Sequence, residues 1–282
     1  MPEPPSPPAA PAASSASPAP SVFGALVAGL RGGAIEAVDL TAPLSSGTPV
    51  LELPPQFGQT ARFELEEISR YDERGPAWYW NNFRTGEHTG THFDAPNHWV
   101  TGREGADIAS VPARQLIAPA VVADFTDEAA KDPDFLVGVA DLQAWEQRHG
   151  ALPEGGWLLL RTGWSSRAYA QEPFLNADES GLHTPGLSAE CARWLAERTP
   201  VIGLGVETVG TDAGRAHSFE PAFPCHSYLM GSGKYGLTQL RNLDRLPPTG
   251  AVLVAGPLPI VTGSGAPARV LALVEHTGGQ RS

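Results

Sequence analysis

A short run of metal-binding side chains is the most informative part of this sequence. Residues 88–98 contain three of the chain's eight histidines and one aspartate, namely His88, His92, Asp94 and His98. Imidazole nitrogens and carboxylate oxygens are ligands of borderline divalent metals. We therefore predict a metal site held by His88, His92 and Asp94, with His98 beside it for proton transfer.

The spacing of these residues favours an extended strand. The four positions differ by even numbers, and alternate residues of a strand share one face. A helix could also bring His88 and His92 together, but Gly90 and Pro96 are poor helix residues. We expect one strand that presents His88, His92 and Asp94 from the same face and then turns at Pro96.

This set of side chains is suited to metal-assisted hydrolysis, for example of an amide. A divalent ion with open positions lowers the pKa of a bound water towards ~7 and polarises a carbonyl group. The leaving nitrogen also needs a proton. Because imidazole titrates near neutrality, His98 is predicted to take a proton from the water and return it to the departing amine.

The rest of the chain predicts a mixed α/β domain with a curved sheet. Short apolar runs bounded by Gly and Pro are typical of strands buried on both faces, and residues 63–68 alternate as in a half-buried strand. A strong helix signal begins at Ser188, a good N-cap residue. The apolar runs are 37–40, 121–125, 157–161, 201–205, 251–255 and 270–274, and helices are expected at 22–30, 139–149 and 188–197.

Composition limits the partners and the compartment. A net charge of −12 argues against nucleic acid or an anionic membrane as a partner. No run approaches the roughly 18 apolar residues of a spanning helix. Two cysteines and no export signal predict a cytoplasmic protein. The Pro/Ala/Ser-rich residues 1–20 are predicted to be a disordered tail, followed by one domain over 21–282.

The run His88-x-Gly-Thr-His92-x-Asp94-x-Pro96-x-His98 resembles the signature of the cyclase-like metal-dependent hydrolases, which include kynurenine formamidases and isatin hydrolases. The resemblance covers about residues 35–275 and implies a swivelling β/β/α fold in a single domain. Further segments resemble the isatin hydrolase branch, namely residues 80–87, 98–102, 160–164, 183–186, 203–214, 223–226, 235–237, 242–244 and 263–265.

The resemblance also implies a metal and further ligands. His226 lies where the formamidases place a histidine on a second zinc, but Thr238 stands at the position of their bridging glutamate. A neutral hydroxyl cannot offset two divalent cations, so a single metal is expected. Gln239, or Thr238 through a water, would complete its coordination. Oxygen ligands suit Mn²⁺, which the isatin hydrolase branch also implies, and Zn²⁺ is the alternative.

Three more polar residues are candidates for the site. Glu207 and Asp212 lie in a Gly-rich stretch after a buried strand. Each could orient a metal ligand or could be a hydrogen-bonded loop carboxylate. His183 is either a substrate-pocket residue or a turn residue.

Aromatic residues flank the metal-binding run and predict an aromatic substrate. Trp80 and Phe83 precede the run and Trp99 follows His98. Flat rings stack on such side chains, although the same residues could fill a core or a subunit interface. Family members form dimers in which a neighbour helps to close the site, so we expect a homodimer or a dimer of dimers.

Isatin, opened to isatinate, is the substrate that the resemblance favours. N-formylkynurenine, in an arylformamidase reaction of tryptophan catabolism, is the alternative, and a ring-closing or dehydrating reaction remains open. Two histidines and a carboxylate also form the facial triad of Fe(II) oxygenases. A metal-stabilised binding module without catalysis would need the metal to have no open position.

Overall fold

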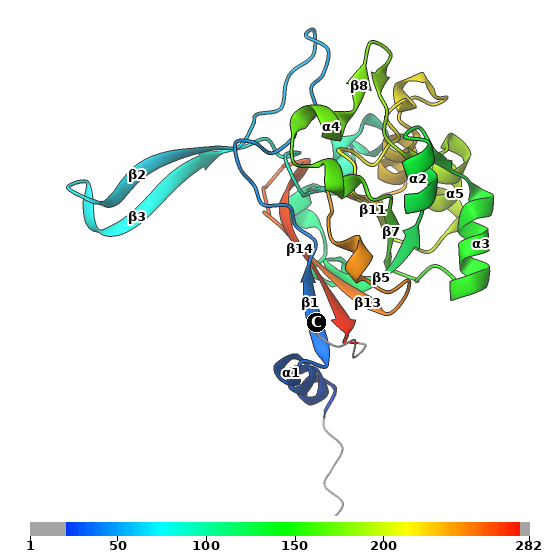
Figure 1. Cartoon of the computed structure of the whole chain (residues 1–282), viewed down its shortest axis with the longest axis horizontal. Coiled ribbons are helices and arrows are strands. Elements are labelled where there is room, and N and C mark those ends of the chain that lie inside the picture. The colour runs from blue at the N-terminus through cyan, green and yellow to red at the C-terminus, as the bar shows by residue number, and fades with distance from the viewer. Residues whose placement is uncertain (1–20, 277–282) are drawn as a thin grey trace, which may run out of the picture. The chain divides into compact units, whose positions relative to one another are not determined.

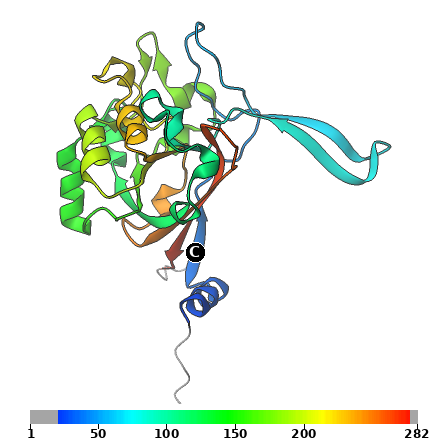
Figure 2. The same ribbon diagram turned by 180° about the vertical axis from the view of Figure 1, so that it is seen from behind.

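The computed structural model describes residues 21–276 of the chain (Figures 1 and 2). These residues form two units, one with residues 21–35 and His276 and the other with residues 36–275. The predicted disordered tail over residues 1–20 lies outside the described residues. The boundary at residue 21 therefore stays a prediction.

The predicted mixed α/β class is confirmed. The helices are α1 Val22–Gly32, α2 Thr126–Lys131, α3 Val139–His149, α4 Gln171–Leu175 and α5 Ala189–Arg198. The strands are β1 Ile35–Asp39, β2 Glu64–Asp72, β3 Gly75–Arg84, β4 His92–Asp94, β5 Ile117–Asp124, β6 Leu136–Val137, β7 Trp157–Arg161, β8 Ala177–Asp178, β9 Gly181–Leu182, β10 Gly186–Leu187, β11 Gly203–Val206, β12 Tyr235–Thr238, β13 Ala251–Pro257 and β14 Gly265–Glu275.

The predicted helices are present. The pattern at 139–149 is helix α3 and that at 22–30 is helix α1. Helix α5 begins after Ser188, whose hydroxyl accepts a hydrogen bond from the backbone N–H of Cys191 at 3.1 Å, as expected for an N-cap. No helix within residues 21–276 combines the length and the apolar character that crossing a membrane would require.

The main sheet curves until it closes on itself. Its strand order is β1-β14-β13-β5-β7-β11-β12-β4, and β4 also pairs with β14. Strands β5, β7, β11 and β12 are parallel, whereas β4, β13 and β14 run antiparallel to their neighbours. Strand β4 thus completes a ring of strands, and both of its edges are hydrogen-bonded.

Apolar side chains cover both faces of the sheet, as the uninterrupted apolar runs predict. Along β7, Trp157 and Leu159 belong to one core cluster, whereas Leu158 and Leu160 belong to another. The second cluster includes Trp145 of α3 and residues of α5. Both helices lie beside the sheet in Figure 1. Strand β7 is therefore held by packing on both of its faces.

Strands β2 and β3 form a separate hairpin. They pair with each other and not with the main sheet, and Figure 1 shows the hairpin in cyan, extending from the rest of its unit. Leu65, Trp80 and Phe83 are more than half exposed on it, at 59%, 54% and 57%. The strand expected at 63–68 is present as part of β2, with Phe63 and Ile68 half-buried as predicted but Leu65 exposed.

Candidate metal centre

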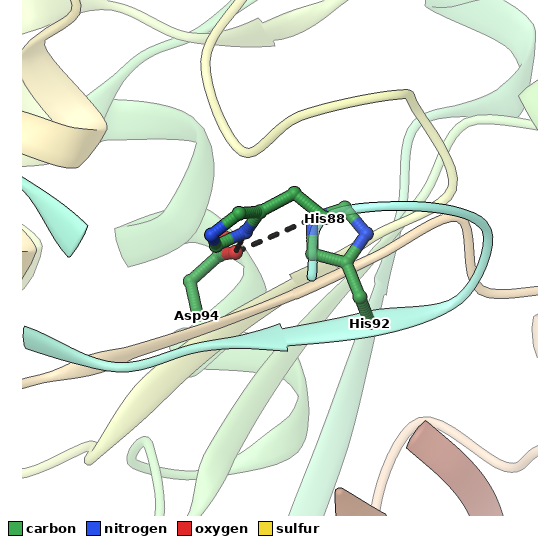
Figure 3. A group of neighbouring side chains, drawn as sticks. All are labelled: His88, His92 and Asp94. Atoms are coloured by element: carbon green, nitrogen blue, oxygen red, sulfur yellow. Dashed lines mark hydrogen bonds and ion pairs between the residues drawn. The ribbon is translucent and has the colours of Figure 1, made fainter. Parts of the chain in front are cut away.

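His88, His92 and Asp94 converge at one point of the sheet (Figure 3). Each offers one ligand atom, and these atoms lie within 4.8 Å of one another. His92 and Asp94 share a face of β4, while Phe93 between them lies in the core. Alternation along the strand therefore places two of the three ligands as predicted.

His88 reaches the site from a turn and not from the strand. Strand β4 begins at His92, and Gly90, with φ +67°, bends the chain before it. A left-handed φ interrupts an extended strand, and glycine adopts it without strain. The prediction of one strand from His88 to Asp94 was therefore wrong, although its three ligands do come together.

Two glycines make room for the ligands. Gly236 of β12 and Gly265 of β14 are the register partners of Asp94 on either side. A Cβ atom on Gly236 would lie 2.6 Å from Asp94 Oδ2, and one on Gly265 would lie 2.6 Å from His88 Cε1. The neighbouring strands thus leave a hollow in which the ligands sit.

The hydrogen bonds of His92 test whether the site fits a metal. His92 Nδ1 lies 2.7 Å from the carbonyl oxygen of Gly90, which can only accept, so Nδ1 carries the proton. His92 Nε2 then presents its lone pair 3.2 Å from Asp94 Oδ1. Two lone-pair atoms so close repel unless a proton or a cation lies between them. This donor set fits a divalent cation.

Asp94 carries the negative charge of the site. It is almost fully buried, and its Oδ1 lies 2.8 Å from His88 Nδ1. Burial raises the pKa of Asp94, but its contacts with the rings of His92 and His88 outweigh burial and hold that pKa well below its usual value. A buried ionised carboxylate needs a positive partner, which again favours a cation here.

His98 is placed beside the ligands as predicted for a proton carrier. It ends a 3-10 turn over Pro96–His98, and its ring stacks on His88 with centroids 3.9 Å apart. Burial lowers the pKa of His98 to about 3, although the charge of Asp94 opposes this. His98 is therefore neutral near pH 7, but in this environment it is a weaker base than the free imidazole on which the sequence prediction relied.

Asp212 orients His226 next to His98. The carboxylate of Asp212 accepts hydrogen bonds from His226 Nδ1 and from the backbone N–H groups of His226 and Cys225. Burial lowers the pKa of His226, but the bond to Asp212 outweighs it and the pKa is raised. The His226 ring lies 5.4 Å from His98 between centroids. Both residues thus lie at the site, and their roles stay predictions.

Thr238 lies nearer to the metal ligands than Gln239, and the role of Gln239 as a ligand stays a prediction. Thr238 is the register partner of His92, and its hydroxyl lies 2.9 Å and 3.1 Å from the two ring nitrogens of His92. The next side chain along the chain points elsewhere, and Gln239 Nε2 donates to the carbonyl of Pro49 at 3.3 Å. The oxygen beside the ligands is therefore the hydroxyl of Thr238.

Glu207 and His183 are engaged away from the metal ligands. The carboxylate of Glu207 accepts bonds from the backbone N–H groups of Thr162 and Trp164 and from the hydroxyl of Ser165. His183 pairs with Asp134 near the β8–β9 turn. These contacts match the loop and turn roles that the sequence left open for both residues, and neither orients a metal ligand.

The aromatic candidates divide into two groups. Trp80 lies on the exposed hairpin, and Phe83 lines an apolar pocket of about 320 Å³ at the hairpin's base with Phe63 and Thr91. Trp99 instead contacts the site, because its ring lies 4.8 Å from that of His226 and 5.6 Å from that of Phe223. Trp99 and Phe223 therefore form the aromatic wall at the metal centre.

Sequence reasoning missed Ser264, Glu87 and Phe223. Ser264 Oγ lies 2.8 Å from His88 Nε2 and donates to Glu87 Oε2 at 2.7 Å. Glu87 is adjacent to His88 in the sequence, and the segment 263–265 resembles the isatin hydrolase branch, but no local pattern joins the two. The pairing of β14 with β4 brings them together.

A closed mixed sheet with a His/His/Asp centre and a neutral histidine beside it is the arrangement expected of a metal-dependent hydrolase. A family model described as "Putative cyclase" matches residues 38–213, more than half of the chain. This chain belongs to the cyclase family, as its sequence motif predicts. The structural similarity to its members confirms the predicted fold class, and the converging His/His/Asp side chains support a metal cofactor.

Known relatives and solved structures are similar to this chain over nearly its whole length. An isatin hydrolase of Roseibium aggregatum is 45% identical over 259 residues, which cover 91% of this chain and 98% of that protein. Isatin hydrolase A from Ralstonia solanacearum is 52% identical with a TM-score of 0.89, covering 92% of this chain and 100% of that one. An isatin hydrolase bound to the product analogue thioisatinate is 44% identical with a TM-score of 0.89, covering 91% and 99%.

Proposed function

We propose that this protein hydrolyses the ring C–N bond of isatin to give isatinate. The observation that carries the proposal is the stacking of neutral His98 on His88, one of three converging metal ligands. It places a proton acceptor beside the site of water activation. The similarity to isatin hydrolases supports isatin as the cyclic amide.

His88, His92 and Asp94 would hold the metal, and Mn²⁺ is the metal we propose, with Zn²⁺ as the alternative. When bound, such an ion activates water and polarises the amide carbonyl. The cluster offers two nitrogens and one carboxylate but no thiolate. The hydroxyl of Thr238 adds an oxygen next to His92, and oxygen ligands suit Mn²⁺.

His98 and His226 move and hold the protons of the reaction. His98 takes a proton from the attacking water, and the same ring then gives it to the leaving nitrogen of the opened ring. His226 is fixed by Asp212 through Nδ1. Its Nε2 has no hydrogen-bond partner within residues 21–276 and can donate to a substrate oxygen.

A flat bicyclic substrate fits the aromatic wall. The rings of Trp99, Phe223 and His226 lie in tilted and edge-on contact around the site. Such rings favour a planar ligand, with about 0.5–1.5 kcal/mol per aromatic pair beyond area burial. Trp99 is held in place because its indole N–H donates to the hydroxyl of Ser227 at 3.2 Å.

A homodimer is the assembly we propose, with a second copy covering the β2–β3 hairpin. An isolated two-stranded hairpin is only marginally stable in water. Here Leu65, Trp80 and Phe83 are more than half exposed on it. Replacing Leu65 and Trp80 by serine together should shift the protein towards monomer in light scattering, while Val261→Ser, another exposed apolar position, should not.

The cytoplasm is the compartment we propose. Cys191 and Cys225 are both buried and unpaired. Free buried thiols agree with a reducing compartment.

The first test is the loss of isatin absorbance with metal-stripped protein reconstituted with Mn²⁺ or Zn²⁺. We expect turnover that requires metal, is faster with Mn²⁺, and falls in His98→Ala. No turnover of isatin by metal-loaded protein would contradict the proposed substrate. Hydrolysis of N-formylkynurenine by the same preparation would then replace isatin with a formamide.

A further inference from the structure

We propose that Glu87 and Ser264 form a positioning pair that fixes the tautomer of His88, so that His88 binds the metal through Nδ1 while His92 uses Nε2. The proposal rests on the metal-dependent function above, because it concerns a ligand of that metal. It assigns roles to two residues outside the triad.

The hydroxyl of Ser264 connects a carboxylate to a metal ligand. Ser264 Oγ donates to Glu87 Oε2 at 2.7 Å, and the backbone N–H of Ser264 donates to the same oxygen at 3.1 Å. On its other side, Ser264 Oγ lies 2.8 Å from His88 Nε2. All three residues are at least half-buried, which limits competition from water.

The single hydroxyl hydrogen of Ser264 fixes the direction of its hydrogen bonds to Glu87 and His88. A serine hydroxyl has one hydrogen, and the ionised carboxylate of Glu87 can only accept it. The hydroxyl oxygen of Ser264 must therefore accept from His88, so the proton of the imidazole lies on Nε2. His88 Nδ1 is left to present its lone pair to the side where Asp94 Oδ1 lies at 2.8 Å.

In His92 the proton lies on the other ring nitrogen, Nδ1. The carbonyl of Gly90 takes the Nδ1 proton of His92, and Nε2 faces Asp94 Oδ1. Each histidine thus has one nitrogen committed to a fixed acceptor and the other directed at Asp94. Outer partners of this kind set the orientation and the tautomer of metal-binding histidines.

Backbone contacts hold the pair rigidly against the metal strand. The carbonyl of Ser264 accepts from the N–H of Ala95 at 3.0 Å, and the side chain of Asn97 donates to the carbonyl of Gly263 at 3.3 Å. A side chain on Gly265 would collide with His88 Cε1. The Ser264 hydroxyl therefore cannot shift far without moving β4 or His88.

The pair also supports His98. Because the His98 ring stacks on His88 with centroids 3.9 Å apart, a His88 ring that flips or rotates removes the surface against which His98 packs. Loss of the Glu87–Ser264 pair should therefore weaken metal binding and, through His98, should also lower turnover.

Metal affinity and histidine NMR test the proposal together. Chelator competition with Zn²⁺ should give about 10–100-fold weaker binding for Ser264→Ala and Glu87→Ala. Glu87→Gln should stay near wild type, because its amide oxygen can still accept the Ser264 proton. Ser166→Ala is the matched control, since that hydroxyl bonds only to the carbonyl of Gly163. Imidazole ¹⁵N spectra of the zinc-loaded protein should show His88 protonated on Nε2.

Wild-type affinity in both alanine variants would overturn the proposal, and so would a His88 signal protonated on Nδ1. If Ser264→Ala does not fold, Glu87→Ala and Glu87→Gln are compared instead. Equal losses of zinc affinity in these two variants would mean that the charge of Glu87 matters and not the tautomer of His88, and would overturn the proposal. These readouts do not use isatin. A wild-type protein that binds metal but leaves isatin intact would refute the proposed substrate alone.

Discussion

His88 and His183 both lie beside aspartates, yet their ring nitrogens are used differently. His183 Nδ1 is 2.7 Å from Asp134 Oδ2 and its Nε2 is 3.1 Å from Asp178 Oδ1. Hydrogen bonds to these two carboxylates raise the pKa of His183 above its usual value. His88 faces a carboxylate with one nitrogen and the hydroxyl of Ser264 with the other.

The difference shows what distinguishes a metal-binding histidine from a histidine that forms ion pairs, such as His183 with Asp134 and Asp178. A histidine that donates to carboxylates from both nitrogens is an imidazolium and has no lone pair for a metal. A histidine that donates once to a neutral acceptor keeps a lone pair, and the structure directs it. The acceptor on the far side of the ring therefore matters as much as the nearby aspartate.

The largest effect should come from Asp94→Asn. This change removes the one anionic ligand and places an amide against histidine lone pairs. We expect metal affinity to fall by more than about 100-fold, beyond the loss typical of outer partners, and turnover to reach background. Metal content after dialysis and isatin turnover would measure both. Asp178→Asn, which changes an ion-pair partner of His183, is the control. Normal metal content in Asp94→Asn would contradict the assignment of Asp94 and His88 to a metal centre distinct from the ion pairs of His183.

His98→Ala should have the next largest effect and should separate catalysis from binding. Removing a proton carrier costs about 10²–10⁴-fold in turnover. The ring of His98 stacks on His88 but bonds to none of the three ligands, so metal should be retained. Loss of the metal along with activity would identify His98 as a ligand and not a proton carrier.

The ligand set could be predicted because it is local. His88, His92 and Asp94 lie within seven residues, and alternation along β4 requires only short-range geometry. The turn at Gly90 was missed because the even spacing of His88, His92 and Asp94 fits one continuous strand and also a bend followed by a short strand. Pattern alone does not reveal a positive φ.

The surroundings of the ligands could not be predicted because strand pairing builds them. Ser264 and Thr238 reach the histidines only because β14 and β12 flank β4. The sequence left Gln239 and Thr238 open as alternatives for the same reason, since the register that places Thr238 opposite His92 is not visible in either segment alone. The buried strands, by contrast, carry their signal in their own composition.

A smaller effect is expected from Asp212→Asn. The Asp212 carboxylate accepts from two backbone N–H groups and from His226, and an amide nitrogen turned towards any of them would leave a buried donor unpaired. We expect a loss of about 1–3 kcal/mol in the free energy of unfolding and reduced turnover with metal retained. Urea denaturation and isatin turnover would measure these, with Asp244→Asn as an exposed control. Unchanged stability and turnover would mean that Asp212 does not position His226 for the reaction.

The smallest effect should come from His183→Gln, and its sign depends on pH. The pKa of His183 is raised by its hydrogen bonds to Asp134 and Asp178. Its contribution to stability is therefore fully present below the unfolded pKa of about 6.5 and is lost as the pH rises through the higher folded value. The urea midpoint of His183→Gln should lie slightly below wild type at pH 6 and coincide with it well above the folded pKa. Metal affinity should be unchanged throughout. A loss of metal in this variant would mean that the ion pairs of His183 and the metal centre are coupled, and that the two histidine environments are not independent.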